Sequence, residues 1–380
     1  SILNVWPGGI SAMVAATDKE SFVYGDFHDY YYPAGRMILK VAKPLGGYFY
    51  TPSFALLLHF FTPESYGDAI ILWGVFQHLW IILLFIIPGI YLAARSGKKL
   101  YFYLYILLTL LCFPLYHNLK WGQLSIMIVF CTIFALILHE RRQYWLAAIS
   151  LATATLAKYY PATFIIYFII RRDTSFIGKF TVVMLIMGLL LPATVFGFAT
   201  TGEFYRLLHA ELDYARDWVI YDINSQFFPH VVLRMAGMEA EATARGILAI
   251  AGMLICLMVF YKIHKVTMTG KNDSMFSASA VFLLFPLMIN TSWPHYFVYM
   301  PFCITLLLQE CRNRRQKLIL MIITAMQSLL IFSLTDYQTF SGSGTLLAAN
   351  MLLLYLWFDA QKTWGCPTGL LRNLKKEVPN

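Results

Sequence analysis

Long apolar runs separated by short polar turns repeat along almost the whole chain. A helix of about 20 mostly apolar residues can cross a bilayer, so the pattern predicts an all-α polytopic membrane protein. The pair 144–157 and 161–170 is too short to cross unaided, which predicts either a re-entrant segment or broken helices that line a cavity. About eleven apolar spans are expected, at residues 68–94, 100–116, 124–138, 144–157, 161–170, 180–198, 244–261, 275–289, 297–309, 318–334 and 345–359.

The turns between these runs alternate between two kinds. Each turn of the first kind carries at least two Lys or Arg side chains, which the positive-inside rule assigns, with the C-terminal tail, to the cytoplasm. These are Arg95 with Lys98 and Lys99, Arg141 with Arg142, Arg171 with Arg172 and Lys179, Lys262 with Lys265 and Lys271, Arg312 with Arg314, Arg315 and Lys317, and Arg372 with Lys375 and Lys376. The second kind is then expected outside: 1–67, 117–123, 158–160, 199–243, 290–296 and 335–344.

Two outer segments, 18–67 and 199–243, are long, but no internal repeat divides the chain, so residues 1–380 are expected to form a single transmembrane domain. In 18–67, Pro33 can begin a helix that runs to about Lys43. Its apolar and basic residues would lie on different sides, as in a helix at a membrane surface. The apolar ones are Met37, Ile38 and Val41, and the basic ones Arg36, Lys40 and Lys43.

Composition agrees with a membrane protein, because 59% of the residues are apolar and only 13% are charged, against about a quarter charged in soluble domains. The net charge of +9 could suggest nucleic acid as a partner. Most of that charge lies in the basic turns, where topology requires it. We therefore expect membrane lipids as partners and no nucleic acid.

Five of the outer loops are crowded with aromatic and ionisable residues, whereas the opposite turns are plainly basic. A protein that only needed to cross a bilayer would have no reason for this asymmetry, so we expect one chemical site at the outer face. The five loops are Gly25-Asp26-Phe27-His28-Asp29-Tyr30-Tyr31-Tyr32, Asn118-Leu119-Lys120-Trp121-Gly122-Gln123, Ala157-Lys158-Tyr159-Tyr160-Pro161, Asn224-Ser225-Gln226-Phe227-Phe228-Pro229-His230 and Ser292-Trp293-Pro294-His295-Tyr296.

Asp26 is the first candidate for chemistry. A carboxylate among aromatic side chains at a membrane surface is partly desolvated, which raises its pKa toward the range of a general base. The alternative is a helix N-cap or a solvated loop acid. Asp26, His28 and Asp29 together could also hold a divalent cation, but three ligands so close in sequence are a weak signal, and no metal or other cofactor is favoured.

Lysines that emerge from apolar helices on the outer side run against the positive-inside trend. Lys158 and Lys120 could simply extend toward the interface, and His295 could be a hydrogen-bonded structural residue. Together, these three groups would suit a lipid phosphate. Side chains of the kinds that bind sugars accompany them: amides bond hydroxyls, and indoles stack on pyranose rings. The candidates for binding sugar or acceptor are His28, Trp121, Gln123, Asn224 and Gln226.

The ordered set of motifs resembles glycosyltransferase family 87, of the GT-C class of membrane glycosyltransferases. The chain is similar to polyprenyl-phosphate-mannose-dependent mannosyltransferases of phosphatidylinositol-mannoside synthesis, over about residues 20 to 300. The resemblance implies a GT-C-like bundle with interfacial helices and one further helix before the first outer loop. The motifs are Gly25-Asp26-Phe27-His28-Asp29-Tyr30-Tyr31, Tyr48-Phe49-Tyr50-Thr51-Pro52, Gly122-Gln123, Lys158-Tyr159-Tyr160-Pro161, Asn224-Ser225-Gln226 and His295-Tyr296.

The resemblance implies a hexose donor carried on a polyprenyl phosphate and a lipid or glycan acceptor. Asp26 matches the family's catalytic base, with Asp29 as the alternative acid, and Lys158 and His295 match positions near the donor phosphate. Mannose is favoured at the level of the family, although glucose, galactose and arabinose fit the residues equally. The expected location is a bacterial plasma membrane, with the active site on the extracytoplasmic side.

Three other functions compete with this one. A transporter or flippase for a lipid or lipid-linked sugar needs access from both faces and often has inverted repeats, but the chain shows no repeat and its unusual loops share one side. A scaffold subunit would not need the acid, histidine and lysine. A ligase or polymerase of lipid-linked polysaccharide would use a diphosphate donor and more arginines in the outer loops.

Overall fold

The computed structural model describes residues 24–238, 242–269, 274–311 and 313–362. This part of the chain is helical and contains no strand. The Lys271, Arg312 and C-terminal members of the basic turns lie outside the described residues.

The first half of the described chain contains η2 (Phe27–Tyr31), α2 (Tyr32–Val41), α3 (Pro52–His59), α4 (Tyr66–Ser96), α5 (Leu100–Leu110), α6 (Phe113–Trp121), α7 (Ser125–Glu140), α8 (Tyr144–Ala157), η3 (Tyr160–Thr163), α9 (Phe164–Ile170), α10 (Thr174–Leu185), η4 (Ile186–Leu190) and α11 (Leu191–Phe196). The second half contains α12 (Phe198–Val219), α13 (Phe228–Met235), α14 (Ala242–Met268), α15 (Ser274–Leu283), α16 (Phe285–Met288), η5 (Pro294–Tyr299), α17 (Met300–Glu310), α18 (Arg314–Met326), α19 (Leu329–Leu334), α20 (Tyr337–Gly342) and α21 (Thr345–Lys362).

Three helices of the described chain are long and apolar enough to cross a membrane: Tyr66–Ser96, Thr174–Phe196 and Ala242–Met268. The predicted all-α membrane protein is therefore confirmed. Each of the other predicted spans also holds a helix, but these helices are shorter or broken, so the expected number of about eleven crossings is not confirmed. Breaks occur where proline follows the first residue of a new helix, as at Pro114 and Pro286.

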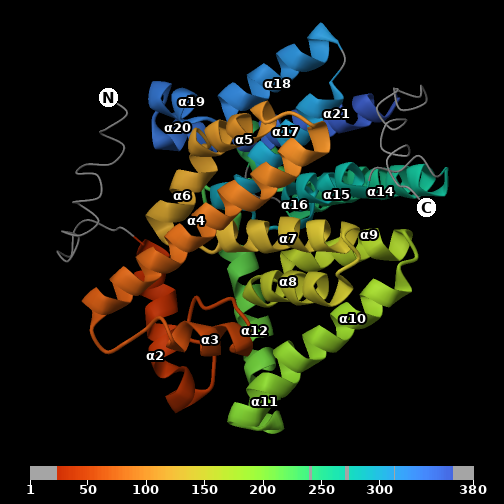
Figure 1. Cartoon of the computed structure of the whole chain (residues 1–380). Coiled ribbons are helices and arrows are strands. Elements are labelled where there is room, and N and C mark those ends of the chain that lie inside the picture. Colours follow the sequence, from red (N-terminus) through yellow and green to blue (C-terminus); the bar gives the residue numbers. More distant parts are fainter. Residues whose placement is uncertain (1–23, 239–241, 270–273, 312, 363–380) are drawn as a thin grey trace, which may run out of the picture.

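Helix α7 lies at the centre of the molecule and packs against α4 and α8 (Figure 1). Nearly every residue of α7 is buried, as expected for an apolar helix with neighbours on all sides. It also packs against η5, and the loop that precedes it contains Gln123. The helix thus supplies a fixed base for the loops that are predicted to be outside.

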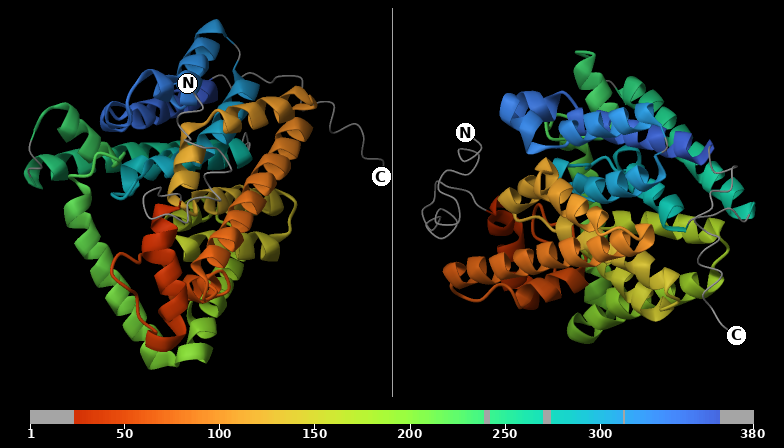
Figure 2. Two further views of the ribbon diagram at one scale, coloured as in Figure 1. Left: turned by 90° about the vertical axis from the view of Figure 1, so that its left-hand side faces the viewer. Right: turned by 45° about the horizontal axis from the view of Figure 1, so that its top comes forward.

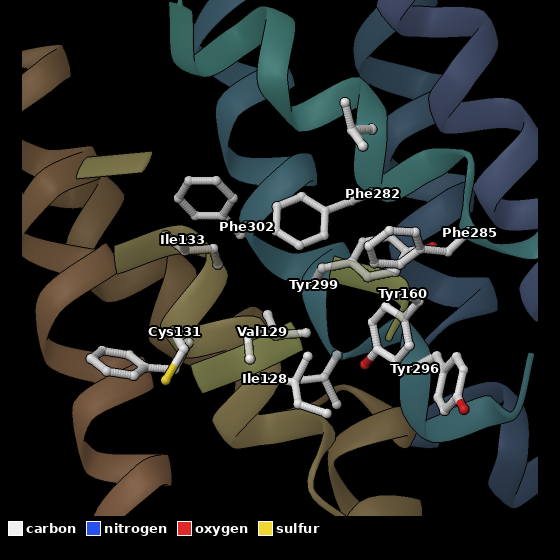
Figure 3. Close-up of a cluster of buried hydrophobic side chains, with 14 of the residues drawn as sticks. Ile128, Val129, Cys131, Ile133, Tyr160, Phe282, Phe285, Tyr296, Tyr299 and Phe302 are labelled. Atoms are coloured by element: carbon white, nitrogen blue, oxygen red, sulfur yellow. The ribbon is translucent and has the colours of Figure 1, made fainter. Parts of the chain in front are cut away.

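A cluster of aromatic and aliphatic side chains fills the space between α7, η3, α15 and η5 (Figure 3). The rings of Tyr160 and Tyr296 lie 4.7 Å apart, and Phe285 packs on the edge of Tyr160 at 4.8 Å. Aromatic pairs at such spacings stabilise beyond the area they bury. This packing holds η5, and with it His295, against the end of α8.

The predicted helix in the first outer segment is confirmed as α2, which ends at Ala42 in a left-handed conformation. Its buried side faces α3 and the turn after it, because a Cβ on Gly35 would lie 2.9 Å from the Leu58 backbone carbon and 2.6 Å from Thr62 Oγ1. Ile38, which we expected on the apolar side of an interfacial helix, is buried, whereas Lys40 is exposed. In the side view of Figure 2, α2 (red) lies between α4 (orange) and α12 (green).

The other long segment, 199–243, consists mainly of helices α12 and α13. Helix α12 packs against α3, and α13 packs against α14 and α20. The segment therefore connects the first outer loop with the last helices rather than forming a separate unit.

Candidate active site

The loop that carries Asp26 is held against the C-terminal end of α6 by a backbone hydrogen bond. Tyr24 adopts a positive φ of 65°, uncommon for a residue with a side chain, and its N–H donates to the Lys120 carbonyl at 2.8 Å. A Cβ on Gly25 would lie 3.0 Å from a ring carbon of Trp121. Asp26 therefore stands beside residues far away in the sequence.

Glycine is also required on the other side of this junction. Gly122 has a φ of +65°, and a Cβ there would approach the Tyr24 Cβ to 2.9 Å. The carbonyls of Gly122 and Gln123 accept hydrogen bonds from α4, from Trp73 Nε1 at 3.1 Å and Gln77 Nε2 at 2.8 Å respectively. The position of the Gln123 backbone is thus fixed by a long membrane helix.

The Gln123 side chain joins the predicted acid to the predicted cation. Its Nε2 donates to Asp26 Oδ2, and its Oε1 accepts from Lys158 Nζ at 3.1 Å and from the Tyr31 hydroxyl at 3.0 Å. A further hydrogen bond links the hydroxyls of Tyr31 and Tyr50. One amide group therefore separates the carboxylate from the ammonium group, although the residues come from three different loops.

Lys158 lies where α8 ends, in an extended conformation, and its side chain is only 8% exposed. The ammonium group lies 4.6 Å from the ring centre of Tyr296 and 5.5 Å from that of Tyr50, positions in which aromatic rings stabilise a cation. Burial lowers the pKa of Lys158 to about 7, and the charge of Asp26 partly opposes this. A buried lysine whose charge is this costly is suited to an anionic ligand.

Asp26 is largely shielded from water as well. Burial raises its pKa to about 6, and the charge of Asp29 adds to this. The hydrogen bond from Gln123 and the charge of Lys158 act in the opposite direction, because both stabilise the carboxylate. A carboxylate with this pKa can accept a proton near neutral pH.

Asp29 and His28 lie one helical turn away and bond each other instead, with 2.7 Å between His28 Nδ1 and Asp29 Oδ1. Their side chains are about half exposed. Asp29 has no hydrogen bond to Gln123, so the geometry favours Asp26 over Asp29 as the reactive acid. Within the described residues, no three His, Cys, Asp or Glu side chains are grouped as a metal site requires.

His295 is buried in η5, and this burial lowers its pKa well below the usual range, with the charge of Lys158 adding to the effect. The ring of Tyr296 adjoins both groups, 5.0 Å from the His295 ring and 4.6 Å from Lys158 Nζ. His295 Nδ1 faces His117 Nδ1 at 3.3 Å, and His117 Nε2 lies 2.9 Å from the Tyr337 hydroxyl. That hydroxyl donates to Asn224 Oδ1, so two of the predicted residues form the ends of one chain of hydrogen bonds.

The other two residues expected to bind sugar, Gln226 and Trp121, differ in how far they are buried. Gln226 is fully buried and ties three outer loops together, because its backbone N–H donates to Ser292 O at 2.7 Å and its Nε2 to Ser341 O at 2.9 Å. Trp121 is half-buried beside Gly25, with Lys120 over its ring. Trp121 therefore keeps a surface that a sugar could reach.

The loops that the charge pattern predicts to be outside thus bond to one another, and the basic turns do the same. Arg95 on α4 forms an ion pair with Glu310 at 2.9 Å, and Tyr91 bonds Glu140, which also accepts from Ser274. These contacts join turns that the charge pattern assigns to the cytoplasm. In the described contacts, each of the two predicted sets of turns therefore bonds within itself.

Tyr31, Tyr50, His117 and Tyr337 belong to the site but were not singled out from the sequence. Tyr31 and Tyr50 lie within quoted motifs, yet a tyrosine among so many aromatic residues gives no signal of its own. Tyr337 lies in a segment that carries no motif. Its place in the site follows only from its hydrogen bonds to His117 and Asn224.

The helical fold and the polar cluster of Asp26, Gln123 and Lys158 together define an all-helical integral membrane protein with a buried polar site. A comparison with protein-family models matches residues 48–291, more than half of the chain, to Glycosyltransferase family 87. The chain belongs to this family and is a membrane glycosyltransferase. The match includes Gln123, Lys158, Asn224 and Gln226, whereas Asp26 and His295 lie just outside it. Comparisons with curated proteins and with solved structures give no match.

Proposed function

We propose that this glycosyltransferase moves a hexose, with mannose favoured, from a polyprenyl-phosphate sugar to a lipid or glycan acceptor at the extracytoplasmic face of the membrane. The observation that carries the proposal is the single Gln123 amide that joins Asp26 to Lys158. A base and a cation this close can act on the two ends of one displacement. Family membership favours transfer over the transport of a lipid.

The reaction would proceed as a single displacement. The acceptor hydroxyl gives its proton to Asp26 while its oxygen forms a bond to the anomeric carbon. The bond from that carbon to the phosphate oxygen breaks, and polyprenyl phosphate leaves with the electron pair. This displacement inverts the configuration at the anomeric carbon.

Lys158 would stabilise the charge that develops on the leaving phosphate. Among the described residues, its ammonium group has one hydrogen-bond acceptor, Gln123 Oε1, which leaves further N–H groups for a phosphate oxygen. A positioned cation in a site of low polarity contributes more than in water. A monophosphate can be held in this way without a metal, and no step requires one.

Gln123 would act as the positioning residue, because its side-chain amide bonds both Asp26 and Lys158. Its backbone carbonyl is itself held by hydrogen bonds from Gln77 and Asn118. The acceptor and the sugar would lie beside Trp121 and His28, on the exposed side of Asp26. Asn224 and Gln226 would shape the opposite wall.

The test is to incubate purified protein in lipid nanodiscs with a panel of polyprenyl-phosphate and polyprenyl-diphosphate sugars and a membrane lipid extract. Mass spectrometry of the products should show transfer from a monophosphate donor, and NMR of the product should show an inverted linkage. Transfer from diphosphate donors alone, or retention of configuration, would contradict the proposal.

A further inference from the structure

A chain of four polar side chains runs from Asn224 through Tyr337 and His117 to His295. At its first end, two hydroxyl groups converge on one acceptor: Asn224 Oδ1 accepts from the Tyr337 hydroxyl and from Ser341 Oγ at 3.2 Å. Since the Tyr337 proton is given to Asn224, its oxygen can only accept from His117 Nε2, at 2.9 Å. His117 therefore carries its proton on Nε2.

The same logic fixes the second imidazole. Both rings are neutral, because burial lowers the pKa of His117 to about 3 and that of His295 well below its usual range, and Lys120 and Lys158 add positive charge nearby. With its proton on Nε2, neutral His117 offers a lone pair at Nδ1. The facing nitrogen, His295 Nδ1 at 3.3 Å, must then donate. His295 Nε2 is left with a lone pair.

That lone pair has no partner among the described residues, although the side chain is only 3% exposed. A buried polar atom left unpaired is costly, and such atoms are few in folded proteins. The atom belongs to a ring that contacts Tyr296, whose other neighbour is the Lys158 ammonium group. The imidazole that carries the unpaired acceptor is thus close enough to Lys158, the group that we assign to the leaving phosphate, to feel its charge.

We propose that His295 Nε2 accepts a hydrogen bond from a hydroxyl group of the bound substrate, with its tautomer fixed by the Asn224, Tyr337 and His117 chain. His295 then serves as a specificity-determining residue for the sugar and not as a phosphate-binding cation. A lone pair repels a phosphate oxygen and attracts a hydroxyl proton. The hydroxyl belongs to the donor sugar or to a glycan acceptor. The assignment of a substrate rests on the proposed function, whereas the tautomers do not.

The tautomers can be measured without activity, by solid-state NMR of the full-length protein in nanodiscs with ¹⁵N-labelled histidine. The signals are assigned by comparison with His117→Asn and His295→Asn. We expect neutral rings with the proton on Nε2 of His117 and on Nδ1 of His295. Tyr337→Phe should abolish this fixed pattern, whereas the matched control Ser341→Ala, which leaves the chain intact, should preserve it.

The substrate arm uses polyprenyl-phosphate-mannose and its monodeoxy analogues, and alkyl mannoside acceptors that each lack one hydroxyl. Wild-type enzyme should discriminate against one of these by about 10-fold in kcat/KM, the value of one hydrogen bond. In His295→Asn, whose shorter side chain can reach the Nδ1 position only, this discrimination should disappear. The arm in which it disappears identifies the donor or the acceptor as the source of the hydroxyl.

A proton on Nε2 of His295 would overturn the proposal, since that nitrogen would then donate, as a phosphate ligand does. Discrimination that is the same in wild type and His295→Asn in both arms would also overturn it. Either result would leave transfer from polyprenyl-phosphate-mannose intact, so failure here is distinguishable from failure of the proposed function. Conversely, the tautomers remain measurable if another donor is used.

Discussion

At the scale of single residues, the site depends on two ionisable groups whose burial moves their pKa values toward each other. The pKa of Asp26 is raised to about 6 and that of Lys158 is lowered to about 7. Each charge partly offsets the cost of burying the other. The proposed reaction needs Asp26 without its proton and Lys158 with one, and these two states coexist only within a limited range of pH.

This arrangement predicts a bell-shaped dependence of kcat/KM on pH. Activity should rise as pH increases through about 6, where Asp26 loses its proton, and fall above about 7, where Lys158 loses its own. Lys158→Arg, which stays charged at all accessible pH values, should retain part of the activity and lose the alkaline limb. An unchanged alkaline limb in Lys158→Arg would remove Lys158 from this role.

At the scale of elements, the site depends on the close approach of the Asp26 loop to the end of α6. A Cβ on Gly25 or on Gly122 would crowd this contact. Gly122 needs both a left-handed backbone and the space beside Tyr24. Gly97, which ends α4, shares the left-handed backbone with a φ of +68° but has open space around it. Comparing Gly122 with Gly97 therefore separates the cost of the left-handed backbone from the cost of the close contact.

Gly122→Ala should therefore lower stability more than Gly97→Ala does. Both pay about 1–2 kcal/mol for the left-handed alanine, and only Gly122→Ala adds about 1–3 kcal/mol for the forced contact. It should also lower transfer, because the Asp26 loop shifts away from Gln123, whereas Gly97→Ala should transfer normally. Thermal unfolding in nanodiscs and product formation measure the two effects. Equal losses in both variants would show that the close approach does not matter.

The meeting of these loops could be predicted from sequence only in part. The alternation of basic and aromatic turns predicted that Asp26 and Lys158 share one side of the membrane, and the structure brings the two residues together through Gln123. The sequence could not reveal Gln123 as the link, since an amide bonds almost any polar group. Nor could it reveal His117 and Tyr337. The role of His117 depends on the packing of α6 against η5, and that of Tyr337 on the hydrogen bond that joins α20 to His117.

At the scale of the whole molecule, the helical fold followed from the apolar runs, but the number of crossings did not. The run 144–157, for example, forms a helix of only 14 residues that ends at Lys158. Hydrophobic length predicts a crossing only where a helix is continuous, as in α4. Broken helices are stable at membrane depth where protein surrounds the break, and burial of Lys158 meets that condition.

The proposed orientation predicts which turns meet the outside. In a background with the six native cysteines replaced, His28→Cys should react with a membrane-impermeant maleimide added to intact cells, because its side chain is about half exposed in an outer loop. Lys98→Cys, at an exposed position in a basic turn, should react only after permeabilisation. The opposite pattern would place the site in the cytoplasm.

The central claim is that the half-buried carboxylate of Asp26 removes the acceptor proton. The most direct measurement compares Asp26→Asn with Asp29→Asn in nanodiscs, following product formation together with binding of the polyprenyl-phosphate sugar. Asp26→Asn should lose about 10²–10⁴ in turnover while donor binding changes little, and Asp29→Asn should stay near wild type. Turnover like the wild type in Asp26→Asn, or an equal loss in Asp29→Asn, would contradict the account.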